Sequence, residues 1–231
     1  MDRPLENRGR ARAAVSRFLP ALVSVALMLM LQMLVFYATR PLLAGRTLYD
    51  MSTSVDARIP FEPAWVLVYF LSFLFWIVNV ALIVTDGPER RARLTAAYSL
   101  ALLVSAAFFL LLPGTIERPT VTGDGFFERW VRFLYRADEP LNLCPSLHVV
   151  MSYFCCRALC GASRVPHWYK GFSLAFTLLV CCCILFVKQH VLIDIPVAFL
   201  VSELCWQLTL RLRLDRLPLA LERRLFPDQI A

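Results

Sequence analysis

The sequence predicts an all-α integral membrane protein with six transmembrane helices. Of the 231 residues, 59% are hydrophobic and only 18% are charged, and the mean hydropathy is +0.62, values that exclude a disordered chain and argue against a soluble domain. Three runs carry no charge, and each is long enough to cross a bilayer, which takes about 20 apolar residues: 18–39, 63–85 and 94–116. We therefore expect one membrane domain over 18–212, with basic tails at 1–17 and 213–231.

The first apolar run follows a segment rich in arginine, so a signal peptide is the alternative to a membrane span. The apolar part of a signal peptide has about 7–15 residues and ends at a cleavage site of small residues. The run 18–39 is longer and no such site follows it. An uncleaved first span is predicted.

Three further spans are shorter or contain isolated charges: 146–163, 171–187 and 191–210. Arg157 lies inside the first of these and Glu203 inside the last. At 1.5 Å per residue they lie about 14 Å and 20 Å inward from the nearest histidines, so a long arginine side chain can reach the glutamate. We interpret them as a structural ion pair rather than a proton path.

Lysine and arginine are more frequent on the side of the membrane that holds both termini. The positive-inside bias then predicts cytosolic termini, with the loops after spans one, three and five on the extracytosolic side. Membrane topology accounts for the net charge of +7. The expected partners are the membrane and its lipids and not nucleic acid, in a plasma membrane or a bacterial inner membrane.

The longest extracytosolic loop, 117–145, contains a predicted amphipathic helix near 125–136. Its two faces are Arg129, Arg132 and Arg136 on one side, and Phe126, Trp130, Phe133 and Leu134 on the other. Such a helix lies on a membrane surface. We interpret it as an anchor, with the gathering of anionic lipid head groups as the alternative.

Seven of the eight cysteines fall inside apolar runs, where a thiol packs as a small hydrophobic group. No pair has the CxxC spacing of a metal site, and Cys156 and Cys160, one helical turn apart, are better explained by packing. We expect no metal and no cofactor.

Two histidines, His148 and His190, each lie at the extracytosolic end of a predicted span. In a helix, Asp194 would lie one turn after His190, where its carboxylate fixes the tautomer of the imidazole and stabilises its positive charge. An aspartate in a membrane span is costly unless it is paired. Lys188 adds a cation beside this pair, and the structural alternative is a snorkelling lysine next to a His–Asp helix cap.

Two further segments on the same side favour an anion. Pro145 suits the first turn of a helix and Ser146 can donate its hydroxyl there, where free N–H groups attract negative charge. Arg118, just beyond the third apolar run, offers a planar fork for phosphate oxygens, although an arginine at a membrane edge is ordinarily a head-group anchor. Together with the histidines, these residues indicate a phosphate site.

Three motifs, Arg118-Pro119, Pro145-Ser146-Leu147-His148 and His190-x-x-x-Asp194, occur in that order and on one side of the membrane. They resemble those of the type-2 phosphatidic acid phosphatase superfamily. Its members include lipid phosphate phosphatases and, with the Pro-Ser-Leu-His form of the second motif, enzymes similar to inositol phosphorylceramide synthases. The resemblance covers about 111–199, and the first two spans match only as generic membrane helices.

The resemblance implies a six-helix bundle in which His190 attacks phosphorus and forms a phosphohistidine while Asp194 orients the ring. His148 would protonate the departing alkoxide and then deprotonate water or an acceptor hydroxyl. The implied phosphate-binding residues are Arg118, Ser146 and Lys188. Fixed cations and helix ends would replace a metal.

The sequence departs from the usual pattern of this superfamily at three positions. Leu111 stands where a lysine is usual, Ile184 where an arginine is usual, and Leu147 where a glycine is usual. Lys188 is one candidate replacement for the missing cations. The others are Arg129, Arg132 and Arg136.

The sequence therefore leads to three functional hypotheses. The first is a phosphatase that hydrolyses a lipid phosphate on the extracytosolic face. The second is a transferase that moves a phospho-head group to an alcohol acceptor, as in inositol phosphorylceramide or sphingomyelin synthesis. The third, a non-enzymatic transporter or scaffold for anionic lipid, differs from both because it predicts that His190→Ala leaves function intact. No residue pattern identifies the head group or the oligomeric state.

Overall fold

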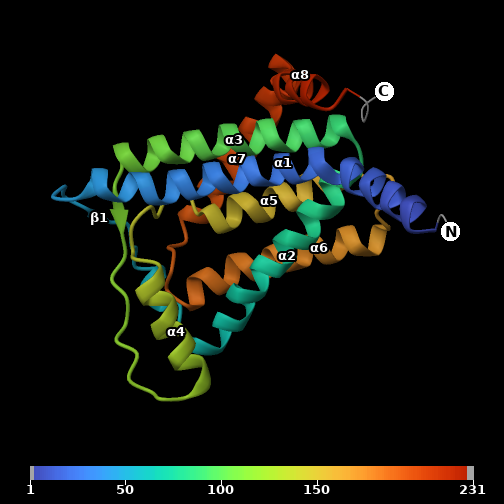
Figure 1. The fold of residues 1–231 in the computed structure, drawn as a ribbon. Coiled ribbons are helices and arrows are strands. Elements are labelled where there is room, and N and C mark those ends of the chain that lie inside the picture. Colours follow the sequence, from blue (N-terminus) through green and yellow to red (C-terminus); the bar gives the residue numbers. More distant parts are fainter. Residues whose placement is uncertain (1–2, 228–231) are drawn as a thin grey trace.

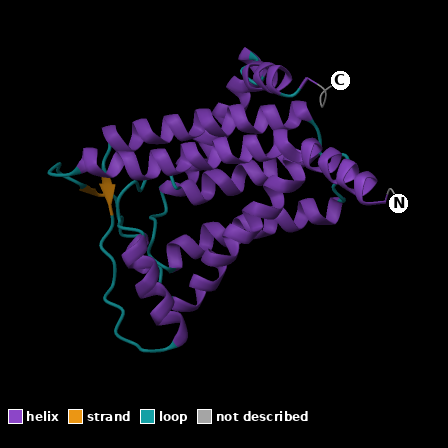
Figure 2. Cartoon of the chain, in the orientation of Figure 1, coloured by secondary structure: helices purple, strands orange, loops and turns teal. Residues whose placement is uncertain are grey.

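A computed structural model describes residues 3–227, with side chains from Phe18 onward (Figure 1). Within this part the chain is mostly helical, with longer loops after α1, α3 and α4 (Figure 2). Its α-helices are α1 (Arg3–Leu43), α2 (Val66–Thr85), α3 (Pro88–Leu111), α4 (Phe126–Ala137), α5 (Leu147–Cys160), α6 (His167–Phe186), α7 (Asp194–Leu212) and α8 (Arg216–Leu225). Two short strands, β1 (Tyr49–Asp50) and β2 (Gly114–Thr115), pair in parallel, with Tyr49 opposite Gly114.

Five segments among the described residues are long and apolar enough to cross a membrane: Phe18–Leu43, Pro63–Thr85, Pro88–Leu111, His167–Phe186 and Asp194–Leu212. α5 has only 14 residues, so it is about 21 Å long. A bilayer core is about 30 Å thick. Five of the six predicted spans therefore correspond to helices of membrane length. The sixth, expected at 146–163, is shorter because its helix ends before Gly161.

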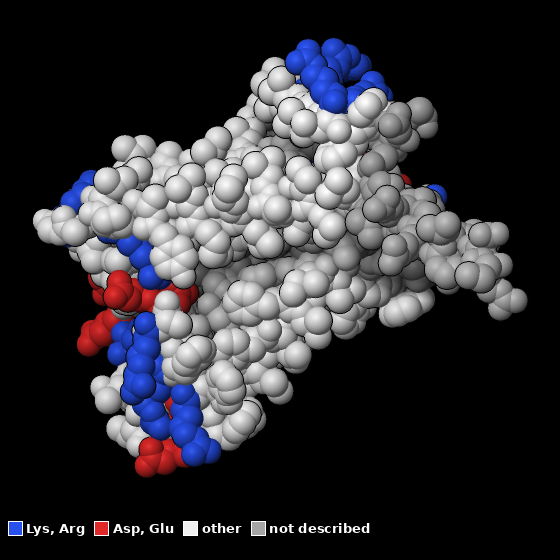
Figure 3. Space-filling model, viewed as in Figure 1, with Lys and Arg blue, Asp and Glu red and all other residues white. Residues whose placement is uncertain are grey.

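The sides of the helical bundle carry large apolar side chains on their outer surface. Leu22 of α1, Ile77 of α2, Leu174 of α6 and Leu200 of α7 are each more than half exposed. In Figure 3, charged residues gather at one end of the molecule and on α8, and the surface between them is uncharged. A continuous apolar surface of this kind is unfavourable in water and favourable in contact with lipid. The chain is thus an all-α, multi-pass membrane protein.

The helices alternate in direction, which brings their connections together at two ends. At one end, the Arg90 side chain donates to the carbonyl groups of Ala158 and Gly161, so the α2–α3 turn lies beside the α5–α6 turn. At the other end, Lys188 donates to carbonyl groups of the loop after α1. The loops after α1, α3 and α6 therefore meet at one end, as Figure 1 shows.

Several helix boundaries differ from those expected. α3 begins at Pro88, a residue suited to a first helical turn, and ends at Leu111, before Pro113. α1 begins at Arg3, so its backbone continues through most of the segment expected as a basic tail, 1–17. The tail expected at 213–231 contains α8. Residues 1–2 and 228–231 lie outside the described part of the chain.

α5 is the central helix of the bundle and packs against α2, α3, α6 and α7. Phe154 is fully buried there, with its ring centroid 5.7 Å from that of Tyr98 on α3. Lower on α5, Arg157 Nε lies 3.2 Å from Glu203 Oε2 of α7, so the ion pair predicted between the two charged spans is present. The helix that holds His148 is thus fixed on all sides.

Candidate functional site

The residues singled out from the sequence converge where the loops after α1, α3 and α6 meet. α5 begins there, deeper in the bundle than the ends of α1 and α3 (Figure 1). The first residues of α5, Leu147 and His148, line a cavity whose other walls come mainly from the loops that meet at this end. His148 is the second residue of α5.

His190 and Asp194 form the expected pair, but not within a helix. α7 begins at Asp194, and His190 lies in the preceding turn, where Lys188 has the left-handed φ of 52°. The prediction that the pair lies one turn apart in a helix is therefore wrong, because that backbone conformation separates α6 from α7. His190 Nδ1 nevertheless lies 3.0 Å from Asp194 Oδ2, which also accepts the N–H of Val191 at 3.1 Å.

This contact decides which nitrogen of His190 can react. A carboxylate only accepts hydrogen bonds, so the Nδ1 facing Asp194 carries the proton. The lone pair then resides on Nε2, on the opposite side of the ring. With only 8% of its surface exposed, His190 presents a single nucleophilic nitrogen in a fixed orientation.

His148 faces His190 from the start of α5. Their ring centroids are 5.7 Å apart and the ring planes meet at 67°. Two aromatic rings of α2 hold the His148 ring on its other sides, with centroids 4.6 Å away for Tyr69 and 5.5 Å away for Trp76. The two imidazoles are therefore close enough to contact one small group between them.

Arg118, in the loop after β2, places a guanidinium beside the histidines. Its Nη1 donates to the main-chain carbonyl of Asp138 at 2.6 Å, and its Nη2 donates to the side chain of Gln189. The guanidinium carbon lies 4.7 Å from the ring centre of Tyr135. Burial lowers the pKa of Arg118 and raises that of Tyr135 to about 12, so a neutral ring faces the cation.

Two cavities meet at Arg118 and His190. The larger, about 380 Å³, is bounded by Lys188 and by the loop from Asp50 to Phe61. The smaller, about 30 Å³, is lined by both His148 and His190. The larger cavity therefore reaches His190, and the smaller one adjoins both imidazole rings.

Lys188 lines the larger cavity, although it also has a structural task. Its Nζ donates to the carbonyl groups of Asp56 at 3.0 Å and Ile59 at 2.6 Å. An ammonium group has three N–H bonds, so one is left for a ligand. Burial lowers the pKa of Lys188, and nearby Asp56 opposes that change.

Ser146 is placed differently from the expectation. It is the N-cap of α5 and is fully buried, but its hydroxyl caps no backbone N–H and lines neither cavity. Pro145 precedes this N-cap, so its predicted position in the first helical turn is wrong. The first-turn N–H groups of α5 still point out of the helix start beside His148.

Four buried donors at this end have no hydrogen-bond partner within the described part of the chain: Arg40 Nε, Arg118 Nε, Ser146 Oγ and Gln189 Nε2. Of these residues, Arg118 and Gln189 line the smaller cavity with both histidines. Buried polar groups are normally hydrogen-bonded, because leaving one unpaired costs about 1–3 kcal/mol. Donors of this kind around two histidines fit an anion with several acceptor oxygens.

Sequence reasoning missed Gln189, Asp138, Arg40 and Tyr69. Gln189, Arg40 and Tyr69 lie in or next to an apolar run and Asp138 lies in a polar loop, and no spacing sets any of them apart from its neighbours. Of the expected replacements for the missing cations, Lys188 lines the larger cavity, whereas the arginines of α4 line neither cavity. Arg129 and Arg136 are exposed, and Arg132 pairs with Asp124 at 3.1 Å.

Among the residues that the structure describes, no group of three or more His, Cys, Asp or Glu is placed to hold a metal ion. The eight cysteines are free thiols. Burial, together with the nearby Asp194 carboxylate, raises the pKa of Cys144 to about 12, so this thiol stays protonated. No protein-family profile matches the chain, and no curated protein matches it.

Proposed function

We propose that this protein is a lipid phosphate phosphatase that works through a phosphohistidine at His190. One observation carries the proposal: the Asp194-oriented His190 faces His148 at 5.7 Å between ring centroids, beside the guanidinium of Arg118. The motif resemblance to the type-2 phosphatidic acid phosphatase superfamily supports the same chemistry. Membrane-spanning helices around the site favour a lipid as the substrate.

In the first step, Nε2 of His190 attacks phosphorus, and a P–N bond forms as the bond to the ester oxygen breaks. His148 gives its proton to the departing alkoxide, which leaves as a neutral alcohol. Arg118, the free donor of Gln189, and the start of α5 stabilise the charge on the phosphoryl oxygens. Asp194 stabilises the positive charge that develops on His190.

In the second step, His148 accepts a proton from water, and the oxygen of that water attacks phosphorus. The P–N bond breaks, and inorganic phosphate leaves with His190 restored. His148 thus acts first as acid and then as base, and ends in its starting protonation state. The larger cavity supplies the path for water and for phosphate.

The topology that fits this proposal has six crossings. α5 would form the sixth, with both termini in the cytosol and the site on the extracytosolic side, because more arginines and lysines accompany the termini. α4 would lie along the membrane surface beside the cavities. The fit of α5 to a bilayer requires that its first turn lies below the level of the lipid phosphates.

A transferase remains the second candidate because of one feature. The larger cavity beside His190 is far bigger than a phosphate needs, and its outer wall carries Asp50, Ser52 and Thr53. These side chains can accept and donate hydrogen bonds to the hydroxyls of an alcohol. Such an alcohol would replace water in the second step.

The test is release of inorganic phosphate from a panel of lipid phosphates by purified protein in detergent with EDTA. Three forms are compared: wild type, His190→Ala and the matched control His167→Ala, whose histidine lies at the opposite end of the bundle. Release by wild type and by the His167 variant alone would support the phosphatase. Equal release by His190→Ala would overturn the proposed nucleophile.

A second arm separates the two enzymes. A phospholipid with a phosphodiester head group and an added lipid alcohol replace the lipid phosphate. Transfer of the phospho-head group to the alcohol, lost in His190→Ala, would identify a transferase. If neither arm shows turnover, the enzyme proposal fails and the lipid-binding scaffold becomes the better explanation.

A further inference from the structure

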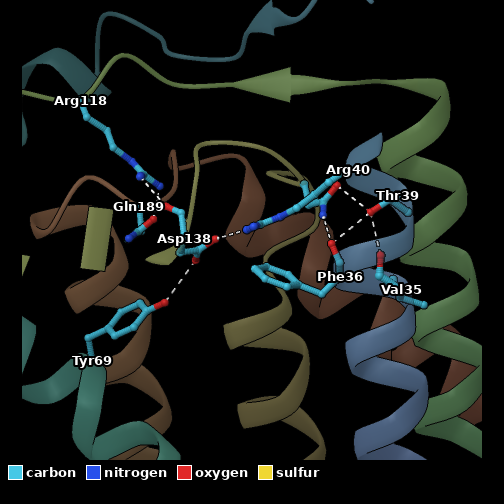
Figure 4. A network of polar contacts seen from close by, with 9 residues as sticks. Val35, Phe36, Thr39, Arg40, Tyr69, Arg118, Asp138 and Gln189 are labelled. Atoms are coloured by element: carbon cyan, nitrogen blue, oxygen red, sulfur yellow. Dashed lines mark hydrogen bonds and ion pairs between the residues drawn. The ribbon is translucent and has the colours of Figure 1, made fainter. Parts of the chain in front are cut away.

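Asp138 is the centre of a polar network (Figure 4). It lines the smaller cavity together with the two histidines. It follows α4 directly, and its carboxylate contacts helices that are distant in sequence. Asp138 Oδ1 accepts from Arg40 of α1 at 3.0 Å, and Oδ2 accepts from the hydroxyl of Tyr69 on α2 at 3.4 Å. Its main-chain carbonyl accepts from Arg118.

Two partners of Asp138, Tyr69 and Arg118, also contact residues of the candidate site. The Tyr69 ring lies against His148, with 4.6 Å between their centroids, so the hydroxyl contact links the Asp138 carboxylate to the ring that packs on His148. Arg118 reaches Gln189, the residue before His190.

The position of Arg40 is equally constrained. Its guanidinium carbon lies 4.1 Å from the centre of the Phe36 ring, on the same helix. Asn142 Nδ2 donates to the main-chain carbonyl of Phe36 at 3.0 Å, and this hydrogen bond holds the last turns of α1 in place. The contacts with Phe36 and Asp138 therefore restrict the Arg40 side chain to one position.

The charges of this network are informative. The guanidinium group of Arg40 pairs with the carboxylate of Asp138, and that of Arg118 donates to the main-chain carbonyl of the same residue. Burial raises the pKa of Asp138, and the neighbouring His190, Arg118 and Arg40 oppose that change. Apolar residues in place of a buried charge network often give equal or greater stability, so stability alone is a weak reason for it.

We propose that Asp138 is a positioning residue of the phosphoryl-transfer reaction, which holds Tyr69, and through it His148, in the orientation needed to protonate the leaving group. This inference rests on the proposed function. Arg40 fixes the carboxylate of Asp138 in that position. Neither Asp138 nor Tyr69 exchanges a proton with the substrate.

Leaving-group dependence distinguishes positioning from a merely structural role. An alkoxide needs a proton to leave, whereas a nitrophenolate is stable as an anion at neutral pH and leaves without one. Two probes with the same apolar chain are therefore compared, dodecyl phosphate and 4-dodecyl-2-nitrophenyl phosphate. General acid catalysis contributes about 10²–10⁴-fold, so its partial misalignment should cost about tenfold or more.

The expected result is that Asp138→Asn and Tyr69→Phe lower kcat about tenfold or more for dodecyl phosphate and less than threefold for the nitrophenyl ester. Tyr69→Phe removes one hydroxyl and keeps the ring, so it decides the question if the Asp138 variant does not fold. The matched control is Asp124→Asn, which breaks an exposed ion pair on the same loop. It should leave both rates unchanged.

Two outcomes would contradict different claims. Equal losses for both probes in Tyr69→Phe, or no loss for either, would overturn the positioning role while the phosphatase stands. Absence of turnover by wild type on both probes would overturn the phosphatase itself.

Discussion

The carboxylate of Asp56 accepts the main-chain N–H of Leu192 at 2.6 Å, which ties the loop after α1 to the turn that contains His190. Thr53 donates to the same side chain from its N–H and its hydroxyl. Lys188 closes the clamp from the other side by donating to carbonyls of that loop. The turn that contains His190 is therefore held by a residue 134 positions earlier in the chain.

Asp56→Asn should weaken this clamp, because hydrogen bonds to a charged group contribute about 1.5–3 kcal/mol. Burial alone would raise the pKa of Asp56, but the hydrogen bonds from Thr53 and Leu192 lower it below 3.8. A group with a lowered folded pKa stabilises the fold above its unfolded pKa, and that contribution is lost as the pH falls through the folded value. Unfolding in detergent, followed from pH 6 to about pH 3, checks this. A stability gap between wild type and variant that stays constant below about pH 3.8 would contradict it.

Asp194→Asn should keep the fold but slow turnover by about 10²-fold or more, because an amide no longer stabilises positive charge on His190. The asparagine oxygen can still accept the N–H of Val191, so the turn before α7 persists. Thermal unfolding and kcat are measured on the same preparation. Turnover within threefold of wild type would remove Asp194 from the mechanism.

Arg118→Ala should raise KM and lower kcat while expression changes little, since its guanidinium faces the cavity shared by both histidines. One lost charge-assisted contact with phosphate corresponds to about 1.5–3 kcal/mol, or roughly 10- to 150-fold in kcat/KM. Arg132→Ala is the control, because that arginine binds loop atoms outside the cavities. Unchanged kinetics in Arg118→Ala would make it a membrane anchor.

Cys144→Ala should be nearly silent. The thiol is 4% exposed, and its pKa of about 12 keeps it protonated at neutral pH, where a thiol is a poor nucleophile. A kcat within about twofold of wild type, and insensitivity of wild type to a thiol-alkylating reagent, check this. Loss of activity in the alanine variant would show that the thiol supports Asp194 or the substrate.

The Arg157–Glu203 pair should matter for stability and not for turnover. Removal of one partner of an ion pair in an apolar region costs about 3–5 kcal/mol when it is fully buried, and less here because both side chains are more than a third exposed. Glu203→Leu should therefore lower Tm, and Arg157→Met combined with Glu203→Leu should restore it. A double variant that folds like wild type but loses turnover would indicate a proton path instead.

Much of the fold is readable from the sequence because a bilayer imposes length and polarity on every helix that crosses it. The runs at 18–39 and 63–85 correspond to membrane-length helices for that reason. α5 is harder to recognise as a membrane helix, because Arg157 interrupts its apolar run and Gly161, a residue common at helix C-termini, ends it after 14 residues. The turn at Lys188 is also hard to predict, because glycine is the usual residue for a left-handed backbone conformation and this position holds a lysine.

The residues of the candidate site also differ in how far the sequence predicts them. His148, His190, Asp194 and Arg118 belong to motifs, and the structure brings all four together. Asp138 and Arg40 owe their role to contacts across 98 positions of sequence. Such contacts arise only from the packing of α1 and α2 beside the loop after α4, which no local pattern encodes.

The short central helix α5 also determines how the site responds to ionic strength. Charges on a flat protein surface are screened by salt over about 8–10 Å at physiological concentrations, but charges within a recess are screened much less. Arg118 lies in such a recess, whereas Arg129 and Arg136 on α4 are exposed. Added salt should therefore lower the affinity of α4 for anionic membranes at concentrations that leave the affinity of the proposed site for phosphate nearly unchanged.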